Sequence, residues 1–315
     1  TTGLSVYLDF ASAVIRYGKS EAISQGVASP SDDQIKTMGR AVVEKKYGNL
    51  FEMYEKITGE DPYYTPMRIY PAIHYTMGGT WVDYNLETSI PGLFATGECN
   101  FSDHGANRLG ASALMQGLAD GYFVLPYTIG TFLSKEIRTP MIDTSAPEFE
   151  AAENDVKNKI QKLLNINGTR SVESFHRELG VDIMWEYCGM ARNAEGLKLG
   201  RKKVRELRDR FWKEVYIPHS DKDGHEFNPE LEKALRVADF FELAELMMVD
   251  ALDRNESCGG HFRDEYATAE GEAQRNDVDY AYVSAWEYNG LDGDPILHKE
   301  QLTFNDIELK TRSYK

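Results

Sequence analysis

Apolar residues recur at the three- and four-residue spacing of a helix through much of the second half of the chain. Four stretches follow this pattern: Ala151–Leu164, Val172–Ala191, Glu195–Tyr216 and Glu230–Arg254. The third stretch carries one apolar stripe, made of Leu197, Leu199, Val204, Leu207, Phe211 and Val215. We predict four helices here and expect the stripe to lie in a hydrophobic core.

The segment from Ser31 to Thr58 also has helical spacing, and it begins with a capping signal. Ser31 precedes two aspartates, whose charges suit the positive end of a helix dipole. Because Gly48 and Asn49 interrupt the pattern, we predict a helical hairpin divided at these two residues.

Brief apolar runs on either side of this segment predict short strands. These runs are Val6–Phe10, Arg68–His74, Thr80–Asp83 and Leu93–Gly97. The last run, LFATG, is closed by glycine, and we expect it to be a buried strand. Toward the C-terminus, an alternating pattern that starts at Asp277 ends in Asn289-Gly290, which predicts a hairpin-like turn.

One apolar segment raises the question of a membrane span. Leu109–Leu133 contains a single charged residue, Asp120, near its middle. A charged residue at that depth of a bilayer costs about 2.5–3.5 kcal/mol, and Pro126 interrupts a regular helix. We therefore predict a buried helix, broken near Pro126, and not a membrane span.

Composition narrows the class of protein. The 315 residues are enough for two or more domains, and 42% hydrophobic with 27% charged residues is typical of a globular protein. The net charge of −16 argues against a nucleic-acid surface and against a polybasic membrane patch. Cys99, Cys188 and Cys258 lie far apart, which favours a reducing compartment and gives no spacing for iron–sulfur or metal ligands. The N-terminal residues show no signal-peptide pattern, so we expect none.

Four short motifs with residues suited to ligand binding follow one another from His74 onward. They are HYTMGG, IPGLFATGE, HGANRLG and the small-residue start of a helix after them. Glu98 follows an expected strand end, where a carboxylate can accept hydrogen bonds from a ribose. The helix start after Asn107 offers free N–H groups to a phosphate or a flavin carbonyl. His74 can move a proton near neutral pH. Arg108 can hold a carboxylate, although an exposed arginine at a close helix contact also fits the pattern.

The pieces HYTMGG, GLFATGEC and HGANRLG closely resemble the flavoprotein subunit of succinate dehydrogenase and fumarate reductase. VYLDF resembles a strand of the family's capping domain. ESFHRELGVDIMWEYCGMARN resembles the opening of its helical domain, and CGGHFRDEY resembles the segment that leads into its C-terminal region. The resemblance implies an α+β multidomain fragment. Its expected parts are the remainder of a capping domain (1–62), the C-terminal part of an FAD-binding domain (63–140), a helical-bundle domain (141–258) and a small β-containing C-terminal region (259–315).

The resemblance also implies roles for five residues. His74 and Arg108 would each bind a carboxylate of a C4 dicarboxylate substrate. Glu98 would hold the ribose of FAD, and Leu114 with the backbone of Ala113 would lie near the flavin ring. Many family members have serine at the position of Ala113, so a backbone contact would survive here whereas a hydroxyl contact would not.

Other parts of the family's machinery are not found in this sequence. There is no strand followed by GxGxxG and a helix, so the main cradle for the FAD pyrophosphate is absent. The resemblance implies that the histidine of covalent FAD attachment and the catalytic, proton-shuttling arginine lie before residue 1. We therefore assign no catalytic residue and no metal ligand within the chain. We expect it to be the C-terminal portion of a longer subunit and to be inactive alone.

For the parent protein, the resemblance implies hydride transfer between succinate or fumarate and FAD. Electrons would pass to an iron–sulfur subunit and, through a membrane-anchor subunit, to quinone, with no nucleic-acid partner. Such a subunit would be peripheral on the cytoplasmic face of the inner membrane or its mitochondrial-matrix equivalent. The alternatives are an enzyme like L-aspartate oxidase, a soluble fumarate reductase, and a non-catalytic subunit-docking fragment.

Overall fold

The computed structural model describes residues 5–70, 77–101, 108, 112–218, 227–306, 308 and 310. The chain divides into two compact units, Thr1–Thr76 and Met77–Lys315. Helices predominate, and each sheet in the described residues has two strands, which agrees with the predicted α+β class. This two-way division does not test the four finer domains, which remain a prediction.

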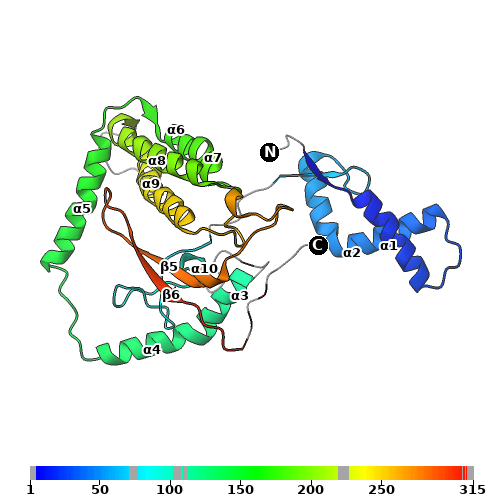
Figure 1. The fold of residues 1–315 in the computed structure, drawn as a ribbon, viewed down its shortest axis with the longest axis horizontal. Coiled ribbons are helices and arrows are strands. Elements are labelled where there is room, and N and C mark those ends of the chain that lie inside the picture. Colours follow the sequence, from blue (N-terminus) through cyan, green and yellow to red (C-terminus); the bar gives the residue numbers. More distant parts are fainter. Residues whose placement is uncertain are drawn as a thin grey trace. The chain divides into compact units, whose positions relative to one another are not determined.

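The first unit joins a two-stranded ladder to a pair of helices (Figure 1). Strand β1 (Val6–Leu8) pairs antiparallel with β2 (Met67–Ile69), and helix α1 (Phe10–Ser24) packs on α2 (Asp32–Thr58). The strand predicted at Val6–Phe10 is thus found at Val6–Leu8, whereas Phe10 already begins α1. The one predicted at Arg68–His74 is found in part, because β2 ends at Ile69 and residues 71–76 lie outside the described residues.

Helix α2 confirms the predicted capping signal but not the predicted break. Ser31 Oγ accepts a hydrogen bond from the Gln34 N–H at 3.3 Å, and Gln34 Oε1 accepts one from the Ser31 N–H at 2.9 Å, which completes a capping box. The helix continues without interruption through Gly48 and Asn49. A glycine inside a helix costs about 1 kcal/mol, and the packing of α2 on α1 outweighs that cost. The prediction of a division there is wrong, and the hairpin consists of α1 and α2.

A close crossing brings α1 and α2 together. A Cβ atom on Gly18 would lie 1.8 Å from the Ile35 carbonyl oxygen, and one on Gly39 would lie 1.8 Å from the Val14 carbonyl oxygen. The two glycines therefore let the helix backbones touch. The core of this unit consists of Val14, Val43, Phe51 and Met67.

The second unit begins with turns and single bridges where strands were predicted. Thr80 bridges Asn100 in parallel, and Glu87 bridges Phe94 in antiparallel. Leu93 is 49% exposed, so the prediction of a buried strand at Leu93–Gly97 is wrong. The run predicted at Thr80–Asp83 likewise contributes a bridge and no strand. A strand needs a partner strand for its backbone groups, and the described residues around this segment supply isolated bridges in its place.

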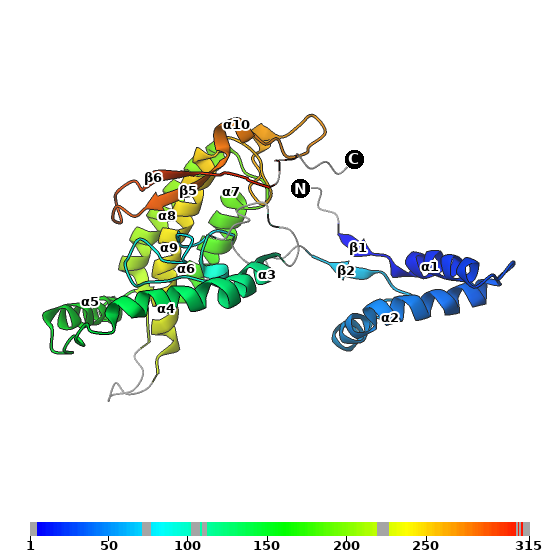
Figure 2. The same ribbon diagram turned by 90° about the horizontal axis from the view of Figure 1, so that it is seen from below.

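The apolar segment that follows forms one helical run (Figure 2). Helix α3 (Ser112–Ala119) passes through a π-helical turn, η2 (Asp120–Val124), into α4 (Leu125–Glu136). The interruption ends at Val124, two residues before Pro126 and close to where it was predicted, because proline cannot donate the hydrogen bond of a regular α-helix.

This helical run is largely exposed, so the prediction that it is buried is wrong. Its buried residues are Ala113 and Thr128, whereas Tyr122, Phe123 and Tyr127 are 73%, 75% and 76% exposed. The apolar segment is helical, as predicted, but few described side chains cover it. No helix in the described ranges is long and apolar enough to cross a membrane.

The main core of the second unit lies among the helices that follow. They are α5 (Pro147–Leu164), α6 (Val172–Arg177), the π-helical turn η3 (Glu178–Trp185), α7 (Glu186–Cys188), α8 (Ala194–Glu214) and α9 (Pro229–Asp253). Helices α8 and α9 lie side by side in Figures 1 and 2. The short parallel pair β3 (Arg170–Ser171) and β4 (Val215–Tyr216) links the segment before α6 to the segment after α8.

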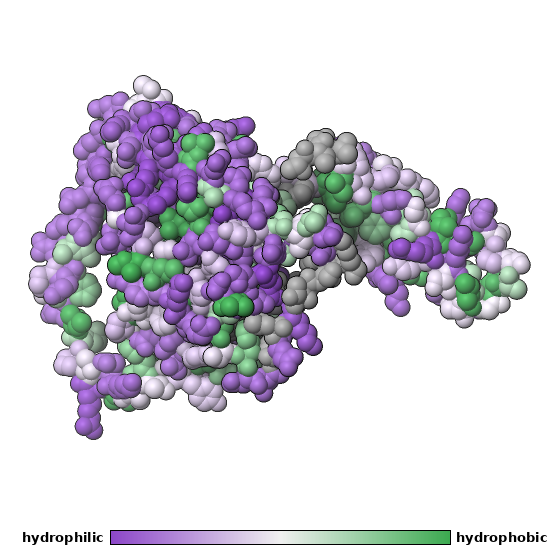
Figure 3. Space-filling view, in the orientation of Figure 1, coloured by the Kyte–Doolittle hydropathy of each residue, from purple (hydrophilic) through white to green (hydrophobic). Residues whose placement is uncertain are grey.

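All four helical predictions for this region are confirmed, with the second interrupted by η3. Five of the six stripe residues are buried, and Leu199, at 46% exposed, is the exception. Phe211 lies among other aromatic rings, with centroid distances of 5.3 Å to Phe175 and 5.4 Å to Phe241. On the face shown in Figure 3, hydrophobic residues form separate groups within a mostly hydrophilic surface.

A C-terminal hairpin completes the second unit, after η4 (Asp264–Tyr266) and α10 (Asp277–Tyr280). Strand β5 (Tyr282–Glu287) pairs antiparallel with β6 (Ile296–Gln301), which confirms the predicted hairpin. Asn289 and Gly290 lie in its connection, which is longer than a two-residue turn. Trp81 Nε1 donates to Glu300 Oε2 at 2.8 Å, so β6 also holds the segment that leads to the candidate site.

Candidate functional site

Three segments of the second unit meet around a short 3₁₀ helix, η1 (Gly97–Cys99). The Thr80 N–H donates to the Cys99 carbonyl oxygen at 2.9 Å, and the Phe101 N–H donates to the Thr80 carbonyl oxygen at 3.0 Å. Helix α3 also packs against η1. The described end of HYTMGG, the GEC turn and the small-residue helix therefore lie together.

Glycines allow these backbone segments to lie close to one another. A Cβ atom on Gly79 would lie 2.4 Å from the Cys99 carbonyl oxygen, and one on Gly117 would lie 3.2 Å from Gly97 Cα. Gly97 itself has a φ of 73°, which favours glycine. The small residues noted in the sequence thus bring backbones together around η1.

The predicted site residues are described to different extents. Glu98 is exposed in η1, Ala113 is 1% exposed in the first turn of α3, and the neighbouring Leu114 is 66% exposed. Arg108 is half-buried, and the residues on either side of it lie outside the described ranges. His74 also lies outside them. The contact between η1 and α3 brings the elements of Glu98, Ala113 and Leu114 together.

This neighbourhood has features that FAD can use. Glu98 offers an exposed carboxylate, which can accept hydrogen bonds from ribose hydroxyls. A Cβ atom on Gly97 would meet nothing within 4 Å, so the backbone is open to a ligand there. Leu114 offers an exposed apolar side chain to a ring. These residues fit the ribose and the ring of FAD, whereas the sequence provides no glycine-rich cradle for its pyrophosphate.

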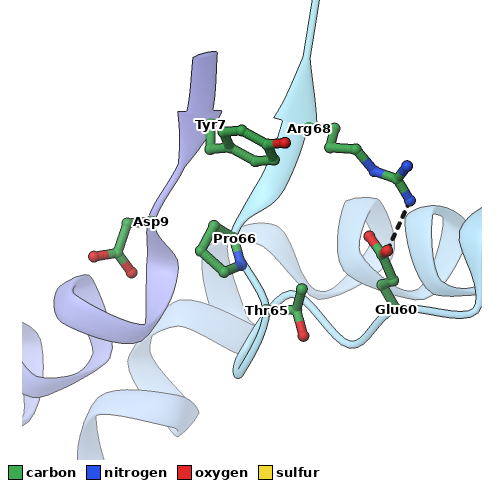
Figure 4. A pocket seen from close by; sticks show the side chains of 6 residues that line it. All are labelled: Tyr7, Asp9, Glu60, Thr65, Pro66 and Arg68. Atoms are coloured by element: carbon green, nitrogen blue, oxygen red, sulfur yellow. Dashed lines mark hydrogen bonds and ion pairs between the residues drawn. The ribbon is translucent and has the colours of Figure 1, made fainter. Parts of the chain in front are cut away.

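A pocket in the first unit contains none of the predicted site residues. It is lined by Tyr7, Asp9, Glu60, Thr65, Pro66 and Arg68 (Figure 4). The Arg68 side chain points toward Glu60, with Nη2 2.7 Å from Oε1. Because these charges already pair with each other, we assign no ligand to the pocket. No cluster of three or more metal-ligating side chains occurs in the part of the chain that the structure describes.

One residue of the site was not singled out by the sequence. Asn100 is 2% exposed, and its amide nitrogen donates to the Ala95 carbonyl oxygen at 3.3 Å. In the sequence, it is a polar residue after GEC with no motif spacing to mark it. The structure identifies Asn100 as part of this site by its burial and by its backbone bridge to Thr80.

Known families match most of the chain. The pattern of the FAD binding domain family matches residues 8–114, and that of the family described as fumarate reductase flavoprotein C-term matches residues 176–314. The succinate dehydrogenase flavoprotein subunit of Bacillus subtilis is 36% identical over 242 residues, which are 75% of this chain and 38% of that protein. The fumarate reductase flavoprotein subunit of Escherichia coli is 30% identical over 290 residues, which are 90% of this chain and 45% of that protein.

A solved quinol–fumarate reductase with menaquinol molecules has a TM-score of 0.71 at 26% identity, and the match covers 92% of this chain and 49% of that one. An L-aspartate oxidase of Synechocystis is 27% identical over 217 residues, which are 65% of this chain and 36% of that protein. The chain spans less than half the length of the first curated relatives it matches. It belongs to the succinate dehydrogenase and fumarate reductase flavoprotein family, whose cofactor is FAD.

Proposed function

We propose that the full-length protein containing this chain interconverts succinate and fumarate. The main support is the meeting of the HYTMGG end, η1 and α3 in a chain of this flavoprotein family. When bound, FAD supplies the partner for hydride transfer. The residues of this chain have the task of binding and orienting the dicarboxylate and the cofactor.

We assign these tasks to the five residues identified from the sequence. Arg108 clamps a substrate carboxylate through its fork of N–H donors, and His74 binds a carboxylate as well. Holding the dicarboxylate in this way orients its C2–C3 bond for reaction. Glu98 accepts hydrogen bonds from the ribose of FAD, while Leu114 and the backbone of Ala113 lie against the flavin ring.

Substitution of Arg108 tests the substrate assignment in the full-length protein. Arg108→Ala should lower kcat/KM for succinate on the order of a hundredfold, because hydrogen bonds to a charged group are worth about 1.5–3 kcal/mol each. Arg108→Lys keeps the charge but loses the fork, so it should restore a part of the activity. Arg236 is exposed on α9 and serves as the matched control, since Arg236→Ala should leave turnover unchanged. Full activity of Arg108→Ala would exclude the assignment.

The enzyme alternative is oxidation of L-aspartate, or fumarate reduction by a soluble protein. Members of the family that act on aspartate need groups for its amino nitrogen, and the sequence does not identify such groups. Steady-state turnover of succinate and of aspartate by the same full-length preparation separates aspartate oxidation from the proposed activity. A kcat/KM for aspartate above that for succinate would overturn our choice.

The non-catalytic alternative is a helical module that docks onto another subunit. The helices α5 to α9 and the net charge of −16 would suit such a contact. The same Arg108→Ala variant separates the two functions, because a docking module would keep its partner binding and show no turnover in any form.

We also propose that electrons leave through an iron–sulfur subunit and a membrane-anchor subunit to quinone. The full-length protein would then be peripheral, on the cytoplasmic face of the inner membrane or its mitochondrial-matrix equivalent. The similar quinol–fumarate reductase supports this by analogy. Succinate:quinone activity of the purified complex, lost when the iron–sulfur subunit is removed while succinate:dye activity persists, tests the pathway. The 315-residue chain alone should reduce no dye with succinate.

A further inference from the structure

A buried asparagine closes the turn that carries Glu98. The Asn100 amide nitrogen donates to the Ala95 carbonyl oxygen at 3.3 Å. Its backbone N–H donates to the Gly97 carbonyl oxygen at 3.4 Å. Both hydrogen bonds run back along the chain, across the segment that contains Glu98. Asn100 therefore ties together the two ends of η1.

The same residue joins this turn to the segment that follows His74. The parallel bridge between Thr80 and Asn100 rests on two hydrogen bonds, made by the chain neighbours of Asn100 on either side. A Cβ atom on Gly79 would lie 2.6 Å from the Asn100 carbonyl oxygen, so the two backbones are in direct contact. Any shift of Asn100 would thus move η1 relative to residues 77–80.

The acceptor of the Asn100 amide is itself held firmly. The Ala95 N–H donates to the Leu86 carbonyl oxygen at 3.1 Å. Leu86 is buried and has a φ of 65°, a conformation that a leucine adopts only when its surroundings impose it. Beside Ala95, the Phe94 ring packs edge-on against Phe132 of α4, with a centroid distance of 5.5 Å. Ala95 is therefore a fixed anchor for the Asn100 side chain.

We propose that Asn100 is a positioning residue that sets the direction of the Glu98 carboxylate toward the ribose of FAD. A three-residue turn has no regular helix or sheet to orient its side chains, so its conformation depends on how its ends are fixed. Asn100 fixes them from a buried position, whereas Glu98 is exposed to the ligand. This inference rests on the proposed role of Glu98.

A double-mutant cycle on FAD affinity tests the proposal in flavin-free, full-length protein. Asn100→Ala should weaken FAD binding about five- to tenfold, because a Glu98 carboxylate that is no longer held in place loses a part of its hydrogen bonding to the ribose. In the Glu98→Ala background, the same change should weaken it less than about twofold, because Asn100 then has no carboxylate to position. Calorimetric titration with FAD gives all four dissociation constants.

A matched variant separates positioning from general stability. The Ser257 side chain is fully buried, donates to the Arg263 carbonyl oxygen at 3.1 Å and accepts from the Arg263 N–H at 2.8 Å. Ser257→Ala removes a comparable side-chain bridge between backbone segments. It should lower the melting temperature as Asn100→Ala does, with FAD affinity unchanged.

The outcomes separate the proposed role of Glu98 from the proposed role of Asn100. If Glu98→Ala leaves FAD affinity unchanged, the proposed role of Glu98 fails. If Glu98→Ala weakens binding but the effect of Asn100→Ala simply adds to it, the positioning role fails while that of Glu98 stands. Should Asn100→Ala fail to fold, Asn100→Ser replaces it in the cycle, because it removes the amide donor without adding a charge beside Glu98. An additive result with Asn100→Ser would overturn the proposal equally.

Discussion

Two regions of the second unit are both rich in apolar residues but differ in what they bury. In α8 and α9, Phe211 and Phe241 are completely buried. In η2 and α4, Phe123 and Tyr127 are 75% and 76% exposed. The helices from α6 to α9 therefore build a core from their own side chains, whereas the run from α3 to α4 presents most of its apolar residues on its surface. Apolar spacing predicts that a helix forms, but the neighbouring elements decide whether it is covered.

The largest expected effect tests this contrast directly. Phe211→Ala should lower the free energy of unfolding by about 3–5 kcal/mol, because it leaves a cavity among three aromatic rings. Phe123→Ala removes the same atoms from an exposed position and should change it by less than about 0.5 kcal/mol. All four tryptophans belong to the second unit, so urea denaturation followed by tryptophan fluorescence reports on this unit. Equal losses in the two variants would contradict the contrast.

The same difference explains how much of the fold could be predicted from the sequence. The stripe through Leu207 and Phe211 predicted its own burial, because the helices that cover it lie nearby in the same chain. The capping box at Ser31 was also predictable, because it is a local hydrogen-bond pattern. Leu93–Gly97 was predicted as a buried strand and is not one, because a strand depends on partners that a short run does not specify.

The residues of the candidate site also differ in whether the sequence alone could identify them. Glu98, Ala113 and Leu114 could be selected from short motifs, since their residue types and spacing carry the family resemblance. Asn100 could not, because its importance comes from a backbone bridge to Thr80, twenty residues earlier in the chain. A contact between distant segments leaves no periodic pattern in the sequence.

The second prediction concerns the close backbone contacts of the site. Gly79→Ala would place a Cβ atom 2.4 Å from the Cys99 carbonyl oxygen and so displace η1. We expect FAD affinity to fall on the order of tenfold, with a loss of about 1–3 kcal/mol in stability from overpacking. Gly130 in the exposed α4 has nothing within 4 Å of its Cβ position, and Gly130→Ala should be neutral or stabilising by up to about 1 kcal/mol. FAD titration measures the affinity of both variants, and thermal unfolding measures their stability. If Gly79→Ala changed neither quantity, the contact between Gly79 and η1 would not be needed for FAD binding.

The third prediction concerns a buried polar residue, His261, which follows the end of α9. His261 is 7% exposed, with Nε2 donating to the Arg254 carbonyl oxygen at 3.0 Å and Nδ1 3.4 Å from Arg192 Nη1. Burial lowers the pKa of His261 below 6.5, and the positive charges of Arg192 and Arg254 lower it further, against the opposing effects of that hydrogen bond and of Asp250. Below pH 6.5 the unfolded chain therefore binds a proton more readily than the folded one.

Stability should consequently fall as the pH drops through this window, by up to about 1.4 kcal/mol per pH unit from this one group. His261→Gln should remove that contribution and flatten the dependence below pH 6.5. His176 is exposed on α6, and His176→Gln provides the comparison variant at the surface. Urea midpoints measured across this range give the slopes. An unchanged slope in His261→Gln would mean that other groups govern the acid sensitivity.

The smallest expected effect concerns the one buried residue of α3. Ala113 is 1% exposed. If the backbone makes the contact with flavin, Ala113→Ser should change FAD affinity by less than about threefold, because a serine hydroxyl in a helix can bond within its own helix. Ala119→Ser, at the exposed end of the same helix, controls for the change in helix propensity. A gain in affinity of about tenfold or more, roughly 1.4 kcal/mol, would show instead that the hydroxyl reaches the cofactor. This helix would then bind FAD through side chains as well as through its backbone.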